Sequence, residues 1–341
     1  MSKNTRLGFA IFTLATAGLV VALAFYFGLR NIHNAGWSLA INTALAKKDP
    51  MYKGLERFKE RVETRSKGRV KIRLFVGSQL GKDENVLEQA RAGANVAVLV
   101  DGGRLAVFTP ELGILGAPYI ANGFPDARKI VTSPLFAEWE ADLREASNHQ
   151  ILSFNWWQGD RHLLTNKPIA LPEDLNGLRI RTPGAPVWME TIRSMGGSPT
   201  PLGWTEIYPA LQQKVIDGAE SQHPGTYESR FYEVISHITK TSHINLITGL
   251  VCSATWFDSL PDDLQVIVRE EALAAGDYAS KLTEDSLADY EARMRAAGVT
   301  ITEIDKRPFY EASKKAYEEL GYVELRKTID ALLNKEQGSN R

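Results

Sequence analysis

Apolar positions along this 341-residue chain follow two spacings, one typical of strands and one typical of helices. The pattern predicts strands at 37–42 and 151–155, and at 70–75 from alternating apolar positions. Apolar runs at 96–100 and 246–252 predict strands that are buried on both faces. Between and after these runs, apolar residues recur every three to four positions and predict helices at 49–66, 83–92, 261–297 and 307–321. Asp49 followed by Pro50 has the composition of a helix start. Strands that alternate with helices indicate an α/β fold with helices covering mostly parallel sheets.

One predicted strand contains two arginines close to its C-terminal end. Alternation places Leu178 and Ile180 on one face and Arg179 and Arg181 on the other, and Pro183 ends the strand. One interpretation of this arginine pair is a solvated strand face. The other is a clamp for a carboxylate, because a guanidinium donates two parallel hydrogen bonds to a carboxylate and keeps its charge.

Two short helices are predicted after this strand, at 187–195 and 207–217. In the second, Ile207, Leu211 and Val215 share one face, and Gly218 is placed as its C-terminal cap. The strand and the two helices together form an α/β unit.

The N-terminus carries an export signal. Lys3 and Arg6 precede an apolar run at 7–29 that contains no charged residue. Ala22 and Ala24 offer a small-x-small cleavage site, yet the run is also long enough to span a bilayer, which takes roughly 20 residues. Residues 1–36 are therefore predicted to be a signal peptide or a signal anchor, and the protein to work outside the cytoplasm.

Composition indicates an ordinary globular protein. With 40 basic and 41 acidic residues the net charge is −1, so no overall field attracts nucleic acid. Cys252 is the only cysteine, which excludes an intramolecular disulfide and predicts a buried, inert thiol. The roughly 300 residues after the signal exceed what one core usually holds, so we expect two lobes.

The chain lacks the common catalytic and metal-binding motifs. It contains no Gly-x-Ser-x-Gly elbow, no His-Glu-x-x-His and no phosphate-binding glycine loop after a strand. The six histidines are scattered, and the closest pair, His237 and His243, is predicted on a helix end and a following strand. We therefore predict no catalytic residues, no cofactor and no metal.

Several segments together resemble one protein family. They are LRIRTP at 178–183, GSPTPLGWTEIY at 197–208 and ALQQKVIDGAE at 210–220, with shorter matches at 77–81, 103–106, 110–113, 117–119, 231–234 and 260–264. In this order they resemble the extracytoplasmic solute-binding proteins of TRAP transporters, the DctP-type family. The match covers nearly everything after the signal.

The resemblance implies an architecture and a function. The fold is an α/β two-lobed periplasmic-binding-protein clam shell with mostly parallel sheets, crossing interdomain segments and a long helix. Lobe I is expected at 37–158 plus about 246–286, and lobe II at 159–245 plus about 287–341. A monomer of this kind binds a small organic acid and delivers it to the small and large subunits of an ion-gradient-driven TRAP membrane permease.

The resemblance also implies ligand contacts. The arginine before the family's strand-ending proline forms the bidentate bridge to the ligand carboxylate, and here it is Arg181, with Arg179 as a companion. A second family arginine matches Arg161, for which a surface loop charge is the alternative. Both arginines are expected to contact the ligand.

The resemblance implies ligand contacts at three further positions. Asn42 matches a ligand-contacting asparagine of the sialic-acid-binding branch, although a turn asparagine would look the same. Trp204 falls where that branch has an aromatic residue against the ligand, with hinge packing as the alternative. Asp101 follows a strand end, where open α/β sheets bind ligands. A second carboxylate, such as that of Asp101, is unfavourable beside the arginines that bind the ligand carboxylate. It is favourable there only if it accepts hydrogen bonds from ligand hydroxyls or pairs with a cation such as Arg104.

One position departs from the family. An asparagine usually follows the Asp-Gly-x-Glu motif, but here Ser221 and Gln222 stand there. A hydroxyl reaches less far than an amide, so we expect a deeper pocket or recruitment of Gln222. We therefore expect a hydroxylated or sugar acid rather than a simple C4-dicarboxylate. The alternatives are a membrane-anchored sensor module and an enzyme that reuses this scaffold.

The signal gives a first testable prediction. Cleavage after Ala24 yields a mature chain that begins at Phe25. Intact mass of the exported protein measures this directly. A mass that still includes residues 1–24 would show a retained anchor, as the sensor alternative requires.

Overall fold

The computed structural model describes residues 36–335, and its strands form one continuous sheet. The strands are β1 (Trp37–Asn42), β2 (Val70–Phe75), β3 (Val96–Asp101), β4 (His149–Thr165), β5 (Arg179–Thr182), β6 (Ser198–Pro201), β7 (Gly218–Ser221), β8 (His237–Ser253) and β9 (Thr300–Thr302). The order across the sheet is β2-β1-β3-β8-β4-β7-β5-β6, with β9 on the edge of β8. The predicted export signal and its cleavage site lie outside the described residues.

Helices cover this sheet on both sides. They are α2 (Pro50–Arg65), α3 (Asp83–Arg91), α4 (Gly102–Leu105), α5 (Gly123–Val131), α6 (Pro134–Ser147), α7 (Pro186–Ser194), α8 (Ile207–Gln212), α9 (His223–Glu228), α10 (Ala254–Asp258), α11 (Asp262–Ala296), α12 (Arg307–Glu319) and α13 (Val323–Lys335). Four short 3-10 turns complete the set: η1 (Pro110–Gly116), η2 (Pro172–Leu175), η3 (Trp204–Glu206) and η4 (Phe231–Glu233). None of the helices within 36–335 is long and apolar enough to cross a membrane.

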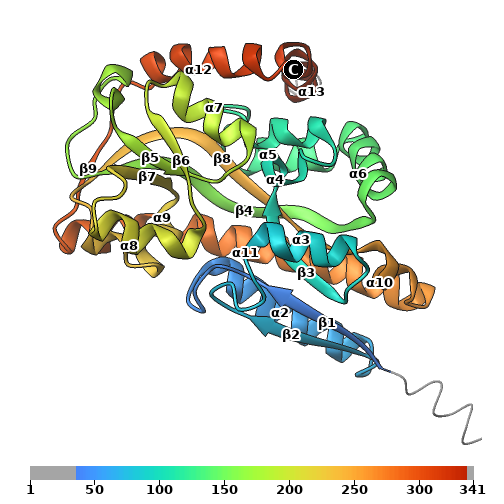
Figure 1. The fold of residues 1–341 in the computed structure, drawn as a ribbon. Helices are drawn as coiled ribbons and strands as arrows, with labels where there is room; N and C mark the ends of the chain where they lie inside the picture. The colour runs from blue at the N-terminus through green and yellow to red at the C-terminus, as the bar shows by residue number, and fades with distance from the viewer. Residues whose placement is uncertain (1–35, 336–341) are drawn as a thin grey trace, which may run out of the picture.

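Two long strands join the halves of the sheet. β4 and β8 pair antiparallel and run side by side across the middle of the molecule (Figure 1). The parallel group β2-β1-β3 adjoins β8, and the parallel group β6-β5-β7 adjoins β4. Helix α11 packs along β4 and against α2, where Glu271 binds Arg61 and Arg65. The predicted α/β architecture with crossing segments and a long helix is confirmed.

Most periodic segments fold as predicted. The first two strands have the predicted bounds, and α11 differs from its prediction by one residue at each end. Asp49 caps α2, because its Oδ1 accepts a hydrogen bond from Met51 N at 2.8 Å. The crossing strands extend well beyond the predicted 151–155 and 246–252.

The predicted helix at 207–217 is too long. α8 ends at Gln212, and Lys214 adopts a left-handed conformation (φ 56°) that turns the chain. Val215, predicted on the buried face, is 48% exposed. Gly218 begins β7 instead of capping the helix, and a Cβ there would lie 2.6 Å from Leu164 O of β4. This glycine therefore permits the close approach of two strands.

Two other local predictions have clear outcomes. His237 and His243 lie in one strand, β8, so the predicted helix end at His237 is wrong. Cys252 is buried in β8, where burial raises the pKa of its thiol well above the ordinary value, in agreement with an inert cysteine.

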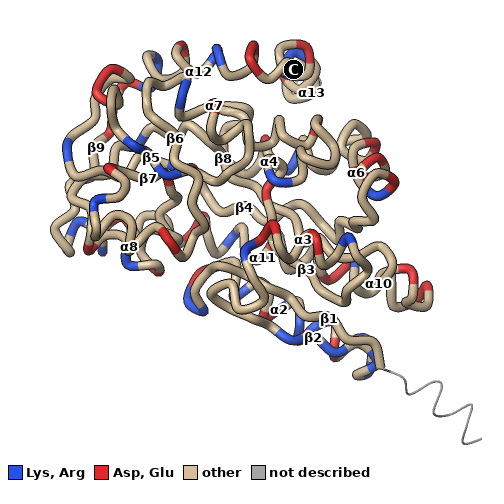
Figure 2. The backbone as a smooth tube through the Cα atoms, viewed as in Figure 1, with Lys and Arg blue, Asp and Glu red and all other residues tan. Residues whose placement is uncertain are grey.

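Charges of both signs are interspersed along the chain (Figure 2). Many of them form pairs within one turn of a surface helix, as Lys314 does with Glu311. This mixture agrees with the balanced composition of 40 basic and 41 acidic residues.

Candidate functional site

A cavity of about 60 Å³ lies beside the crossing strands, between the two halves of the sheet. Its walls come from the ends of β1, β3, β5 and β7, from the middle of β4 and β8, and from α3, α4, α7 and η3. The lining residues are Thr43, Ala44, Leu45, Asp83, Leu99, Asp101, Arg104, Gln158, Arg161, Arg181, Pro183, Trp188, Trp204, Gln222, Leu246 and Thr248. The carboxyl ends of strands are where open α/β sheets bind ligands.

Arg181 is the least satisfied cation of this cavity. It is 1% exposed, and its Nε and Nη2 both donate to the carbonyl of Leu202, at 2.9 and 2.6 Å. Its Nη1 has no hydrogen-bond partner among the described residues, and Glu220 Oε1 lies 4.0 Å away. Burial lowers the pKa of Arg181 to about 9, against the opposing effect of Glu220. An anion that reaches Nη1 would stabilise this guanidinium.

Arg161 is better paired. Its Nε donates to Glu220 Oε2, its Nη2 to Glu220 O at 2.5 Å, and its Nη1 to Gln222 Oε1 at 2.8 Å. Thr182 Oγ1 donates to the other oxygen of Glu220 at 3.2 Å. Two buried arginines therefore share one fully buried carboxylate, which leaves this side of the cavity with excess positive charge.

The opposite side of the cavity carries Asp101. Its Oδ1 accepts from Arg104 N at 3.1 Å and from Trp188 Nε1 at 2.9 Å, and its Oδ2 binds Arg104 Nη1. Burial acts to raise the pKa of Asp101, but the charge of Arg104 and the hydrogen bonds from Trp188 and Arg104 hold it below the ordinary value. The predicted pairing of Asp101 with Arg104 is thus present.

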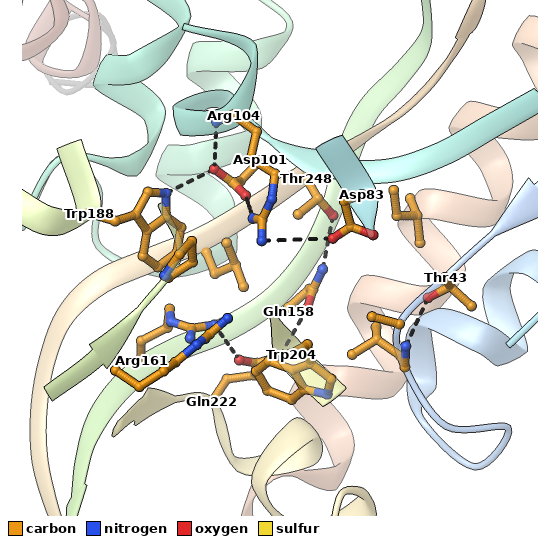
Figure 3. A pocket seen from close by; sticks show the side chains of 16 residues that line it. Thr43, Asp83, Asp101, Arg104, Gln158, Arg161, Trp188, Trp204, Gln222 and Thr248 are labelled. Atoms are coloured by element: carbon orange, nitrogen blue, oxygen red, sulfur yellow. Dashed lines mark hydrogen bonds and ion pairs between the residues drawn. The ribbon is translucent and has the colours of Figure 1, made fainter. Parts of the chain in front are cut away.

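Asp83, the first residue of α3, faces the same space (Figure 3). Its Oδ1 is buried and has no hydrogen-bond partner within the described residues, and its Oδ2 lies 3.8 Å from Arg104 Nη2. Burial raises the pKa of this carboxyl to about 6, although Arg104 opposes the shift. Asp83 therefore presents a free acceptor to the cavity.

A chain of hydrogen bonds between two amides and a hydroxyl connects the Arg161 side of the cavity to the Asp101 side. Gln222 Nε2 donates to Gln158 Oε1 at 2.9 Å, and Gln158 Nε2 donates to Thr248 Oγ1 at 3.2 Å. In Figure 3 Gln222 lies beside Arg161 and Trp204, Thr248 lies beside Asp83, and Gln158 lies between them. The cavity thus has a cationic end, an acceptor-rich end and a polar wall between them.

The structure brings most of the predicted site residues to this cavity. They are Arg181, Arg161, Trp204, Asp101 and Gln222. The indole of Trp204 lies over both arginines, with its ring centre 5.8 Å from the guanidinium carbon of Arg181 and 5.9 Å from that of Arg161. Its Nε1 donates to Ser229 Oγ at 3.0 Å, which fixes the ring.

Three of the residues singled out from the sequence lie elsewhere. Asn42 is buried beside the cavity, where its Nδ2 donates to Gly81 O and its Oδ1 accepts from Leu80 N, both at 3.1 Å. Ser221 is buried within β7, and its Oγ donates to Gln222 O at 3.1 Å. Arg179 is exposed and pairs with Asp217.

Sequence reasoning missed other lining residues, notably Asp83, Gln158, Trp188 and Thr248. An acid in the first turn of a helix is ordinary, so Asp83 carried no signal. Trp188 lies within a predicted helix and Thr248 within a predicted strand, whereas Gln158 lies beyond the predicted end of its strand. Among residues 36–335, no group of three or more His, Cys, Asp or Glu side chains is arranged to hold a metal ion.

Comparison with known proteins places this chain in a family. The family model described as "Bacterial extracellular solute-binding protein, family 7" (DctP) matches residues 41–322. Among curated proteins, the sialic acid-binding periplasmic protein SiaP of Vibrio cholerae is 26% identical over 319 residues, with 94% of this chain and 95% of that protein covered.

Solved structures agree with this assignment. A TRAP periplasmic solute-binding protein of Escherichia fergusonii in an apo open form is 46% identical, with 87% of this chain and 100% of that chain covered and a TM-score of 0.77. A TRAP protein of Ochrobactrum anthropi with bound L-fuconate is 31% identical, with 88% and 100% covered, and its TM-score is 0.84.

The family match spans most of the chain, and the solved TRAP proteins share its fold over their whole length. The chain therefore belongs to the DctP family and is a periplasmic solute-binding protein of a TRAP transporter.

Proposed function

We propose that this protein binds a hydroxylated or sugar acid, with the ligand carboxylate at Arg181 and the ligand hydroxyls at Asp83 and Asp101. The observation that carries the proposal is the buried Nη1 of Arg181, a donor without a partner among the described residues, on the cavity side opposite two carboxylates. A carboxylate at Arg181 and Arg161 would balance the two arginines that share Glu220.

The acceptor-rich end supports the choice of ligand class. A second ligand carboxylate beside Asp83 and Asp101 would be repelled, whereas hydroxyl groups donate to carboxylates. Relatives agree with this chemistry. Solved TRAP proteins 31% and 29% identical to this chain carry L-fuconate, L-galactonate or D-glucuronate, and an Escherichia coli relative binds 2,3-diketo-L-gulonate.

We propose that two lobes close on this ligand. Lobe I is 37–158 plus about 246–286, and lobe II is 159–245 plus about 287–341. Gly159 lies opposite Leu246 in the β4–β8 pair, so the 158/159 and 245/246 boundaries face each other. Gly159 has a left-handed φ of 100°, and the strand register shifts beside it, which suits a hinge. At the C-terminal end α13 packs on α5, so residues 323–335 contact the first lobe.

The delivery partners are part of the same proposal. The TRAP family implies membrane subunits, and we propose that a monomer hands its acid to the small and large permease subunits. The family consists of transport binding proteins rather than enzymes, which sets the enzyme alternative aside.

A thermal-shift screen tests the ligand class. We expect L-fuconate, L-galactonate or D-glucuronate to raise the Tm, and succinate and malate to have little effect. A ligand at 100 times its Kd stabilises the folded state by about 2.7 kcal/mol. Stabilisation by the C4-dicarboxylates alone would overturn the proposed ligand class.

Arg181→Ala should abolish acid binding and leave the protein folded. Loss of two charge-assisted hydrogen bonds removes about 3–6 kcal/mol, which weakens binding by a factor of about 100 or more. Isothermal titration calorimetry measures the affinity, and circular dichroism checks the fold. Arg179→Ala is the matched control, because Arg179 lies in the same strand, outside the cavity and paired with Asp217. Undiminished affinity in Arg181→Ala would refute the role of Arg181.

Asp83 should make both stability and binding depend on pH. Its folded pKa of about 6 exceeds the ordinary aspartate value of 3.8, so the folded state binds more protons and its contribution to stability rises as the pH falls from about 7 to 4. Ligand affinity should decrease as the pH falls from about 7 through 6, because protonation of Asp83 removes a charged acceptor for ligand hydroxyls.

Asp83→Asn is the comparison variant. It should make both the free energy of unfolding and the ligand affinity less dependent on pH. Urea unfolding measures the first and calorimetry the second, between pH 7.5 and 5. Other groups that titrate in this range, such as Asp49 with a pKa of about 7, are common to both proteins and cancel in the difference. Identical pH profiles of affinity would argue against a ligand contact at Asp83.

A further inference from the structure

Trp188 connects the two halves of the sheet beside the cavity. It lies in the first turn of α7, which follows β5, and it is 1% exposed. Its indole packs on Gly103 of α4 and Gly116 of η1, and both of these elements follow β3 in the other half of the sheet. A side chain from one half is therefore buried in the other.

Two glycines make room for this indole. A Cβ on Gly103 would lie 2.5 Å from Trp188 Nε1, and a Cβ on Gly116 would lie 3.2 Å from the same atom. The first distance is a clash, and the second is tighter than an ordinary contact. We call the space between these glycines the glycine slot. Neither glycine has a left-handed φ, so close approach, and not backbone conformation, requires them.

Trp188 also forms specific contacts to charged groups on both sides of the cavity. Its Nε1 donates to Asp101 Oδ1 at 2.9 Å, and its ring centre lies 4.9 Å from the guanidinium carbon of Arg161. A hydrogen bond to a carboxylate and a cation–π contact are both strengthened by burial. One side chain thus holds the acceptor end and the cationic end together.

We propose that Trp188 is the latch of the closed protein: closure of the lobes inserts its indole into the glycine slot and fixes Asp101, and ligand release requires its withdrawal. This inference rests on the proposed closure of the lobes around an acid. Trp188 acts here as a positioning residue, because it holds the closed arrangement through Asp101 and the slot.

The latch makes a kinetic prediction. Contacts that form only on closure lengthen the life of the closed complex, so their loss raises koff and leaves kon nearly unchanged. Trp188→Phe removes the Nε1 donor and part of the ring. We expect about a tenfold rise in koff, the change expected from losing one hydrogen bond to a charged group.

Gly116→Ala separates the latch from direct ligand contact. Gly116 is not among the lining residues of the cavity, and the atoms nearest to a Cβ there belong to Trp188 and Val187 of α7, at 3.2 Å each. We expect it to raise koff several-fold, with kon within about twofold of the wild type, because only the closed arrangement brings α7 against it.

Two matched controls separate the latch from general destabilisation. Trp256→Phe makes the same substitution in another core, where the buried Nε1 has no hydrogen-bond partner within the described residues. Gly36→Ala adds a methyl group whose nearest neighbour, Arg69 O, is at an ordinary 3.5 Å. Both controls should retain the wild-type koff, whatever their effect on Tm.

The measurement is stopped-flow fluorescence of the mature protein with L-fuconate, L-galactonate and D-glucuronate, using the tryptophans that remain in each variant. A raised koff in both latch variants and in neither control supports the proposal. If an acid binds the wild type and Gly116→Ala releases it at the wild-type rate, the latch is wrong and the proposed function stands. If none of the three acids binds the wild type, the proposed ligand class fails and the latch fails with it.

Discussion

The pairing of β4 with β8 is the constraint on which the rest of the molecule depends. These two strands alone connect the parallel group β2-β1-β3 to the parallel group β6-β5-β7 through the sheet. Because both strands pass beside the cavity, they also carry much of its polar wall, with Gln158 on β4 and Thr248 on β8. Register in this pair therefore fixes the site and the connection between the halves at once. Helix α11 packs along β4, which braces the crossing.

The charges of the cavity are arranged for a ligand more than for stability. Removing a guanidinium from water is costly unless its donors are paired, and Arg181 keeps one donor unpaired within the described residues. Glu220 binds Arg161 and accepts from Thr182, but its Oε1 lies 4.0 Å from Arg181 Nη1, which is too far for a hydrogen bond. Across the cavity, Asp83 Oδ1 has no hydrogen-bond partner among residues 36–335. Such imperfectly satisfied groups are typical of binding sites, where function opposes maximal stability.

The accuracy of the sequence predictions follows from the range of the interactions behind them. β1, α2, β2, α3, β3 and α11 were predicted within about one residue, because alternation, helical spacing and the Asp49 cap are local. The crossing strands were underestimated, since polar residues such as Gln158, Arg161 and His243 interrupt their apolar pattern. These residues are buried because the cavity and neighbouring side chains receive them, which no local pattern reveals. The helix at 207–217 failed for a similar reason, because a left-handed Lys214 and the contact of Gly218 with β4 override its helical spacing.

The sequence by itself determined the α/β class, the long helix, the arginine at the end of β5 and, through the order of its motifs, the family. Tertiary structure decided which side chains share the cavity. It separated Arg181 from Arg179, two positions apart in one strand, by burying the first at Leu202 and leaving the second exposed at Asp217. It also placed Gln222 in the cavity wall and Ser221 within the sheet, and brought Asp83 and Trp188 to a site that their own segments did not predict. The physical reason is that strand alternation and helical spacing act over a few residues, whereas the cavity is formed by groups that lie far apart in the chain.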